Sequence, residues 1–288
     1  MDERPLGNGP TGDSAVEAAF SLLADETRLS ILRELYEADQ PLSFSTLRER
    51  VGVRDSGQFN YHLGKLTDQF VDHGESGYEL NNAGVRILGA VFAGSYDGDV
   101  TIEPVPIDDP CPLCDGSLQA VYDRDHFEIT CRDCETHLVG YPAPPGILRG
   151  RERSELPDVF SRYARRVLEQ IADGFCPFCL GPTEPELGAD APVGVGIIYT
   201  CRHCGVEMTM DASISLLGDP EATTFLREHG LAIDEAPLWN LGPLFDAEER
   251  VIEDVSDPAA IAFAVESDGR TLTIRLDDEF SVLETRQD

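Results

Sequence analysis

The sequence predicts an α+β protein with a winged helix-turn-helix at its N-terminus, two zinc ribbons that each carry four cysteines, and a β-meander at its C-terminus. Three observations support this prediction. Apolar residues recur with helical spacing up to about residue 94, all eight cysteines fall into four Cys-x-x-Cys pairs, and apolar and polar residues alternate after residue 260. A spacing of three to four residues is typical of helices packed on a core, whereas alternation is typical of strands.

The N-terminal domain is expected over residues 13–94, in the order helix, helix, short helix, helix, hairpin, helix. Side chains that cap helices, and a glycine that ends one, set the boundaries. The expected helix starts are near Ser14, Asp25, Ser43, Asp55 and Asn81, and the short helix is expected to end at Gly52. Residues 70–80 indicate two strands around a glycine-containing turn. This order predicts a winged helix-turn-helix.

The fourth helix has one apolar face, formed by Phe59, Leu63 and Leu66, which leaves the opposite face for solvent or a partner. Amide side chains suit adenine edges in the major groove, and cations suit phosphate. The candidate DNA-contacting residues are Arg54, Ser56, Gln58, Asn60, Tyr61, His62 and Lys65. A solvated helix face is the alternative for this set, and His62 is expected to support the turn by hydrogen bonding rather than to bind metal.

Two glycines, Gly57 and Gly64, lie within the same helix. Each costs about 1 kcal/mol of helix propensity relative to alanine. A close approach of the helix to DNA would explain that cost.

Two motifs of this domain resemble a known family. The segment Leu23-Ala24-Asp25-Glu26-Thr27-Arg28-Leu29-Ser30-Ile31-Leu32 is similar to the opening of ArsR-type regulators, and Asn60-Tyr61-His62-Leu63-Gly64-Lys65-Leu66 resembles their recognition helix. The resemblance implies a transcriptional regulator that binds double-stranded DNA as a homodimer joined through its first and fifth helices. Two features depart from the family: the turn of the hairpin, residues 73–77, has no arginine or lysine, and the helices contain no cysteine. The thiol metal-sensing site of some ArsR proteins is therefore missing.

The cysteines form two repeats of the pattern Cys-Pro-hydrophobic-Cys, strand, Cys-Arg-x-Cys, with gaps of 16 and 21 residues between the pairs. Four thiolates on two tight turns suit a tetrahedral Zn²⁺ ion with no open position, which favours two structural zinc ions. The candidate ligands are Cys111, Cys114, Cys131, Cys134, Cys176, Cys179, Cys201 and Cys204. A zinc- or redox-sensing role and a disulfide framework are the alternatives.

The composition indicates the compartment. The net charge is −32, and of the 22 basic residues only Lys65 is a lysine, which indicates a folded protein from a halophilic cytoplasm. The N-terminus has no apolar signal segment, and no apolar run is long enough to cross a membrane. A cytoplasm keeps thiols reduced, which favours metal over disulfides.

The rest of the chain is divided by its prolines and cysteines. Residues 95–110 are expected to form a proline-rich linker, 111–145 the first ribbon, 157–173 a basic amphipathic helix, and 174–288 the second ribbon with a helix near 219–229 and the β-meander. The segments 43–66 and 149–166 have a local excess of basic residues. For the helix over 157–173, packing between domains is favoured over dimerisation or DNA contact.

Of two other functions, that of a transcription adaptor and that of a zinc enzyme, only the first stays open. A winged helix joined to a zinc ribbon is similar to the archaeal initiation factor TFE, so the chain could be a basal transcription or adaptor protein that contacts the transcription machinery. A zinc enzyme needs an open metal position, which sites made only of cysteine do not provide. We therefore expect no enzyme activity.

Overall fold

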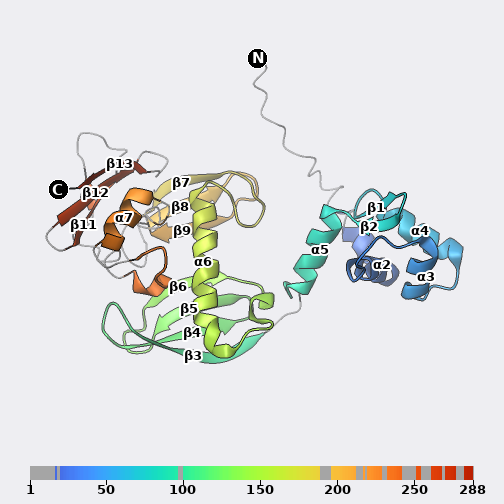
Figure 1. The fold of residues 1–288 in the computed structure, drawn as a ribbon, viewed down its shortest axis with the longest axis horizontal. Helices are drawn as coiled ribbons and strands as arrows, with labels where there is room; N and C mark the ends of the chain where they lie inside the picture. The colour runs from blue at the N-terminus through green and yellow to red at the C-terminus, as the bar shows by residue number, and fades with distance from the viewer. Residues whose placement is uncertain are drawn as a thin grey trace, which may run out of the picture. The chain divides into compact units, whose positions relative to one another are not determined.

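The structure is a computed structural model. It describes residues 17, 20–96, 100–188, 196–211, 217, 219–228, 232–241, 251–253, 261–267, 270–276 and 282–287. The chain divides into two compact units, Met1–Gly98 and Asp99–Asp288 (Figure 1). In the part of the chain that is described, every helix is too short or too polar to span a bilayer.

The N-terminal unit contains four described helices and one hairpin. They are α2 (Glu26–Tyr36), α3 (Phe44–Val51), α4 (Ser56–Leu66), β1 (Val71–Gly74), β2 (Gly77–Leu80) and α5 (Asn82–Phe92). Each of the four helices begins where a capping side chain accepts a backbone N–H two or three residues further on. These caps are Asp25, Ser43, Asp55 and Asn81. The predicted helix starts are therefore confirmed, except the one near Ser14, which lies outside the described residues.

The core of this unit lies between α2, α4 and the hairpin. Ile31 and Leu32 of α2 and Phe59 of α4 are fully buried in it. Gly52 ends α3 with a φ of 77°, as predicted for a left-handed helix end. Gly84 allows α5 to pack closely, because a Cβ atom there would lie 2.4 Å from the carbonyl oxygen of Phe70.

The C-terminal unit contains three antiparallel sheets. The first consists of β3 (Thr101–Pro110), β4 (Ser117–Asp123), β5 (His126–Cys131) and β6 (His137–Pro142) in that order. The second consists of β7 (Thr183–Gly188), β8 (Gly196–Cys201) and β9 (Glu207–Asp211). The third consists of β10 (Val251–Glu253), β11 (Ile261–Ser267), β12 (Arg270–Leu276) and β13 (Val282–Gln287). The predicted C-terminal meander is confirmed, whereas β10 was not predicted, and the turn at residues 268–269 lies outside the described residues.

One segment differs from its prediction. Most of residues 95–110, expected as a linker, form β3, which pairs along its length with β4. Prolines usually exclude a segment from a sheet because they lack the N–H donor, but an edge strand has one side that needs no donor. β3 lies at the edge of its sheet, so Pro104, Pro106 and Pro110 are tolerated there.

The helix α6 (Leu156–Ala172) organises the C-terminal unit. It buries eight residues, and its Phe160 ring stacks on Phe127 of the first ribbon with ring centroids 4.7 Å apart. Further along, the Ser161 hydroxyl accepts the backbone N–H of Leu238 at 3.0 Å. The guanidinium of Arg165 donates to the Ala236 carbonyl at 2.6 Å. The helix predicted over 157–173 is therefore present, and it packs within the C-terminal unit and ties Arg165 into the interior. The packing between domains that the sequence favours for it stays a prediction.

One short α-helix and three 3₁₀ turns are also described in this unit. They are α7 (Pro220–Glu228) and the 3₁₀ turns η1 (Pro145–Leu148), η2 (Arg153–Glu155) and η4 (Leu238–Asn240). The buried Trp239 of η4 donates its indole N–H to the Asp109 carboxylate of β3 at 2.9 Å. Apolar residues of both ribbons, α6, α7 and β12 join in one core.

Candidate metal centres and an exposed helix face

The first cysteine cluster joins two turns at one end of the first sheet. Cys111 and Cys114 lie on the turn between β3 and β4, and Cys131 and Cys134 lie on the turn after β5. The Sγ atoms of Cys111 and Cys134 are 3.9 Å apart, and those of Cys114 and Cys131 are 3.6 Å apart. The Cys111 and Cys131 side chains are buried, whereas Cys114 and Cys134 are exposed. The cluster therefore lies at the surface of the ribbon with two ligands anchored in its core.

The second cluster repeats this geometry. The Sγ atoms of Cys176 and Cys204 are 3.7 Å apart, and those of Cys179 and Cys201 are 3.5 Å apart. All four sulfur atoms of each cluster lie within 4.8 Å of one another. The sequence repeat is thus also a structural repeat.

The donor set fits a tetrahedral metal ion. A zinc–sulfur bond of about 2.3 Å gives a tetrahedron whose sulfur atoms are about 3.8 Å apart, close to the 3.5–3.9 Å of the four measured pairs. A disulfide requires about 2.05 Å, so the cysteines are free thiols here. The two clusters could therefore hold two metal ions, one in each ribbon.

Glycines at matching positions let the two turns of each ribbon meet. A Cβ atom at Gly116 would lie 2.6 Å from the Asp133 carboxylate, and one at Gly181 would lie 2.7 Å from the Cβ of His203. Each glycine follows the first cysteine of its ribbon by five positions. The shared offset of these glycines in the repeat is a signal that could have identified them from the sequence.

The thiols of each cluster influence one another's ionisation. In the first ribbon, hydrogen bonds from the Thr136 side chain and backbone lower the pKa of Cys134 to about 6. A backbone hydrogen bond from Gly116 lowers the pKa of Cys114, but the neighbouring Cys134 and Cys131 outweigh it and raise that pKa to about 12.

In the second ribbon, too, one cysteine has a lowered pKa and another has a raised pKa. Burial raises the pKa of Cys201, but backbone N–H groups of Cys204 and His203 outweigh it and lower that pKa to about 6. At Cys179 a hydrogen bond from the Gly181 N–H lowers the pKa, but burial and the other cysteines outweigh it and raise the pKa to about 12. Without a cation, one thiol ionises readily and its charge keeps a neighbour protonated. A divalent cation removes this repulsion and lets all four sulfur atoms act as thiolates.

The α4 helix presents most of the candidate DNA-contacting residues to solvent. Its inner face buries Phe59, Leu63 and Leu66. The exposed members of the candidate set are Arg54, Ser56, Gln58, Asn60, Tyr61 and Lys65. The ammonium group of Lys65 lies over the Tyr61 ring, 5.6 Å from its centroid. The structure therefore gathers six of the seven predicted residues on and beside one exposed helix face.

The seventh residue, His62, points elsewhere. Its side chain is only 12% exposed, and its Nδ1 lies 3.3 Å from Oδ1 of Asp25, without the alignment of a hydrogen bond. The same oxygen accepts the backbone N–H of Arg28 at 3.0 Å as the cap of α2. His62 therefore contacts the start of α2, whereas the hydrogen bond expected from it to the turn is not formed by Nδ1.

The cations of α3, the following turn and α4 have no ion-pair partner among the described residues. Among the described residues, ion pairs engage Arg28, Arg124, Arg202, Arg227, Arg275 and Arg286. No described carboxylate pairs with Arg48 or Arg50 of α3, with Arg54 of the turn, or with Lys65 of α4. Other described arginines, such as Arg33 and Arg86, also have no described ion pair; what distinguishes Arg48, Arg50, Arg54 and Lys65 is that all four lie on α3, the following turn and α4.

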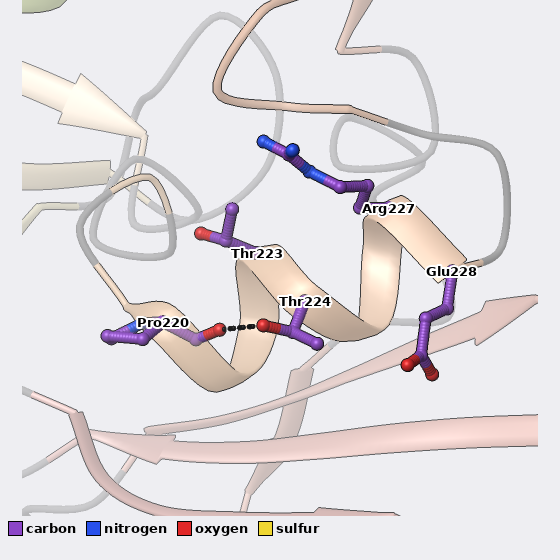
Figure 2. Close-up of a pocket in the computed structure, with 5 residues that line it drawn as sticks. All are labelled: Pro220, Thr223, Thr224, Arg227 and Glu228. Atoms are coloured by element: carbon purple, nitrogen blue, oxygen red, sulfur yellow. Dashed lines mark hydrogen bonds between the residues drawn. The ribbon is translucent and has the colours of Figure 1, made fainter.

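A hollow of about 500 Å³ lies beside α7 and is lined by Pro220, Thr223, Thr224, Arg227 and Glu228 (Figure 2). Two of its polar side chains have partners: the Thr224 hydroxyl donates to the Pro220 carbonyl at 2.7 Å, and Arg227 pairs with Asp234.

Comparison with known families gives two matches. A family described as a domain of unknown function, DUF7351, matches residues 108–282, which is more than half of the chain and most of the C-terminal unit. A second domain of unknown function, DUF7347, matches residues 16–91 in the N-terminal unit. No curated protein and no solved structure matches the chain.

Proposed function

The chain belongs to the family described as domain of unknown function DUF7351, and since that description assigns no activity, we propose a function from the described residues: sequence-specific binding of double-stranded DNA by a transcriptional regulator. The observation that carries this proposal is the exposed face of α4. It presents Gln58, Asn60 and Lys65 beside cations that no described carboxylate neutralises.

The order of elements supports a winged helix-turn-helix. We assign α3, the turn at residues 52–55 and α4 to the helix-turn-helix, and β1 and β2 to the wing. In this arrangement α4 enters the major groove, where the amides of Gln58 and Asn60 suit adenine edges. Arg48, Arg50 and Arg54 are placed to contact the phosphates that border the groove.

Wings often contact the DNA backbone, but the hairpin of this chain is not expected to do so. Its exposed charged residues are Asp72, Glu75 and Glu79, all acidic, and its His73 and Tyr78 rings stack with centroids 4.0 Å apart. Carboxylates repel phosphate, so this hairpin does not supply backbone contacts in our proposal. Affinity must then come from α3, the turn and α4.

We propose a homodimer as the binding species. The α5 helix leaves Val85 45% exposed and Val91 39% exposed, and Tyr96 just beyond it is 73% exposed. Phe20, in the segment before α2, is 66% exposed. These apolar surfaces suit a second copy of the chain, and a two-fold dimer would present two α4 helices to half-sites about 34 Å apart.

For the C-terminal unit we propose that both cysteine clusters hold structural zinc. Zinc bound to four thiolates cross-links the two turns of each ribbon and has no open position for a reaction. Because thiolates must stay reduced to bind the ion, this proposal also favours a cytoplasmic location.

The decisive experiment is fluorescence anisotropy of the zinc-loaded chain on a duplex from upstream of its own gene, in multimolar KCl, against scrambled DNA. The Asn60→Ala/Lys65→Ala double variant should lose at least tenfold in affinity while its thermal unfolding is unchanged, because both side chains are exposed. An Arg33→Ala variant is the matched control, since it removes an exposed cation from the outer surface of α2. Equal affinity of the double variant and the parent would contradict the proposed role of α4.

One observation favours a second function, that of an adaptor for the transcription machinery. Apolar side chains are exposed around the second cysteine cluster, with Phe175 and Leu180 at 53% and Phe178 at 57%. Leu180 also has a φ of 61°, in a region that leucine rarely adopts. The matching residue of the first ribbon is Asp115, which tolerates its φ of 57° more easily. Copurification with RNA polymerase at near-equal stoichiometry, lost in a Phe178→Ser variant, would favour this function over the first.

A further inference from the structure

The solvent-facing side of the first ribbon carries two histidines that both approach one glutamate, outside the cysteine cluster. His126 and Glu128 alternate along β5, and His137 begins β6. Nε2 of His126 lies 3.7 Å from one oxygen of the Glu128 carboxylate, and Nδ1 of His137 lies 3.1 Å from the other. The three side chains are 42%, 35% and 66% exposed, in the order His126, Glu128, His137.

The strand register brings the three residues together. Phe127 and Ile129 point into the core, so His126 and Glu128 share the opposite, solvent-facing side of β5. The pairing with β6 shifts between Ile129 and Thr130, and this irregularity places His137 opposite Thr130. A residue opposite Thr130 lies on the same side as Glu128, so the irregularity turns His137 towards the carboxylate.

A glycine provides the space in which these side chains meet. Gly140 is the partner of Glu128 across the sheet. A Cβ atom at this position would lie 3.3 Å from Nε2 of His126 and 3.5 Å from Cγ of Glu128. The absence of a side chain there leaves the imidazole free to lie over β6.

We propose that His126, Glu128 and His137 form a third metal site, open to solvent and selective for a divalent transition ion such as Zn²⁺ or Co²⁺. Metal bonds of about 2.1 Å to nitrogen and oxygen separate two donor atoms by about 3.0–3.4 Å, and the measured separations are 3.1 and 3.7 Å. The imidazoles approach different oxygens of the carboxylate, and the donor atoms of the three residues do not all lie within 4.8 Å of one another. One imidazole must therefore turn about its Cα–Cβ bond to share an ion, which the exposure of His137 permits.

The donor types determine the class of ion and the chemistry of the site. Imidazole suits zinc, cobalt and nickel, whereas magnesium and calcium prefer oxygen donors. Three protein donors leave at least one position for water, unlike the closed cysteine clusters. The neighbouring hollow is lined by Asp123, Arg124 and Asp125. Arg124 pairs with Asp123, which leaves the Asp125 carboxylate to attract a cation to the site. This site does not depend on the proposed DNA binding.

The test is a metal titration of the full chain whose cysteine clusters already contain zinc. Isothermal titration calorimetry with Co²⁺ should find one further equivalent, and the bound cobalt should lack the intense charge-transfer absorption of a thiolate site. The His126→Ala and His137→Ala variants should each lose this equivalent, and Glu128→Gln should weaken it at least tenfold. All three should keep two zinc ions per chain, because the substituted side chains lie on the solvent side of the sheet.

His73→Ala is the matched control, since it removes an exposed histidine from the hairpin of the other unit. It should bind the further equivalent as the parent does. A parent protein that binds no cobalt beyond its two zinc ions would overturn the proposal. So would a further equivalent that persists in both histidine variants, because it would then lie elsewhere on the chain.

Discussion

Substitution of Gly64 by alanine separates the stability of the N-terminal unit from its proposed DNA binding. Gly64 lies inside α4, and a Cβ atom added there would have no neighbour within 4 Å. Its surroundings thus contrast with those of Gly84, where the added atom would lie 2.4 Å from a backbone oxygen. Packing within the chain explains the glycine at 84 but not the glycine at 64.

We expect the Gly64→Ala substitution to raise the stability of the N-terminal unit and to lower its affinity for DNA. Alanine removes the helix-propensity cost of glycine, a gain of about 0.8–1.0 kcal/mol. For a domain of this size, 1 kcal/mol corresponds to an increase in Tm of about 4–8 °C. If α4 lies in the major groove with its Gly64 face towards DNA, the added methyl group prevents the close approach. We expect at least a tenfold loss of affinity, which corresponds to about 1.4 kcal/mol.

Differential scanning calorimetry and fluorescence anisotropy on the same preparation measure the two effects. Gly89→Ala is the control, because Gly89 lies inside α5 and its added Cβ atom would also have no neighbour within 4 Å. It should raise Tm similarly and leave DNA affinity unchanged, with the dimer mass checked by light scattering. A Gly64→Ala protein that is more stable and binds DNA as tightly as the parent would refute the reasoning, because this face of α4 would then not approach DNA.

The remaining predictions concern packing, metal and pH. Gly84→Ala should destabilise the N-terminal unit by about 1–3 kcal/mol through overpacking, measured by urea unfolding. Gly181→Ala should reduce bound zinc from two ions to one per chain by metal analysis, because the added atom would lie 3.2 Å from the Sγ of Cys201. Chelation should unfold the C-terminal unit and spare the N-terminal one, whose core contains no cysteine, as followed by hydrogen exchange of each unit. Burial raises the pKa of Tyr122 and Tyr199 to about 12. Because the unfolded chain loses these phenol protons at a lower pH than the folded chain does, the C-terminal unit should lose stability as the pH rises from about 10 to 12. Alkaline denaturation measures this loss.

Features that depend on neighbouring residues could be predicted from the sequence. The caps Asp25, Ser43, Asp55 and Asn81 were found because each bonds a backbone group two or three positions away. The cysteine clusters were found because a repeat at fixed spacing indicates two ligands on one turn. The face of α4 followed from its periodicity, which the burial of Phe59, Leu63 and Leu66 confirms.

Features that depend on distant residues could not be predicted. The prolines of β3 suggested a linker because nothing local shows that a strand will lie at the edge of a sheet. Gly116 and Gly181 are required by residues that lie 17 and 22 positions further along the chain, Asp133 and His203. The approach of His137 to Glu128 depends on an irregularity in strand pairing, which a sequence does not display.

Residues of α4 that the fold explains can be separated from those that it does not explain, and function is best sought among the second group. The inner face of α4 is explained by the core, and His62 is explained by its contact with Asp25. Stability alone would favour alanine at position 64, whereas Arg48 and Arg50 lie in the last turn of α3, where positive charge stabilises a helix. Packing within the chain does not explain Gly64, which costs α4 stability, so we look for its reason outside the fold. In our proposal the exposed amides of α4 and the cations of α3 and α4 suit a polyanion, which is why DNA is the partner that we test first.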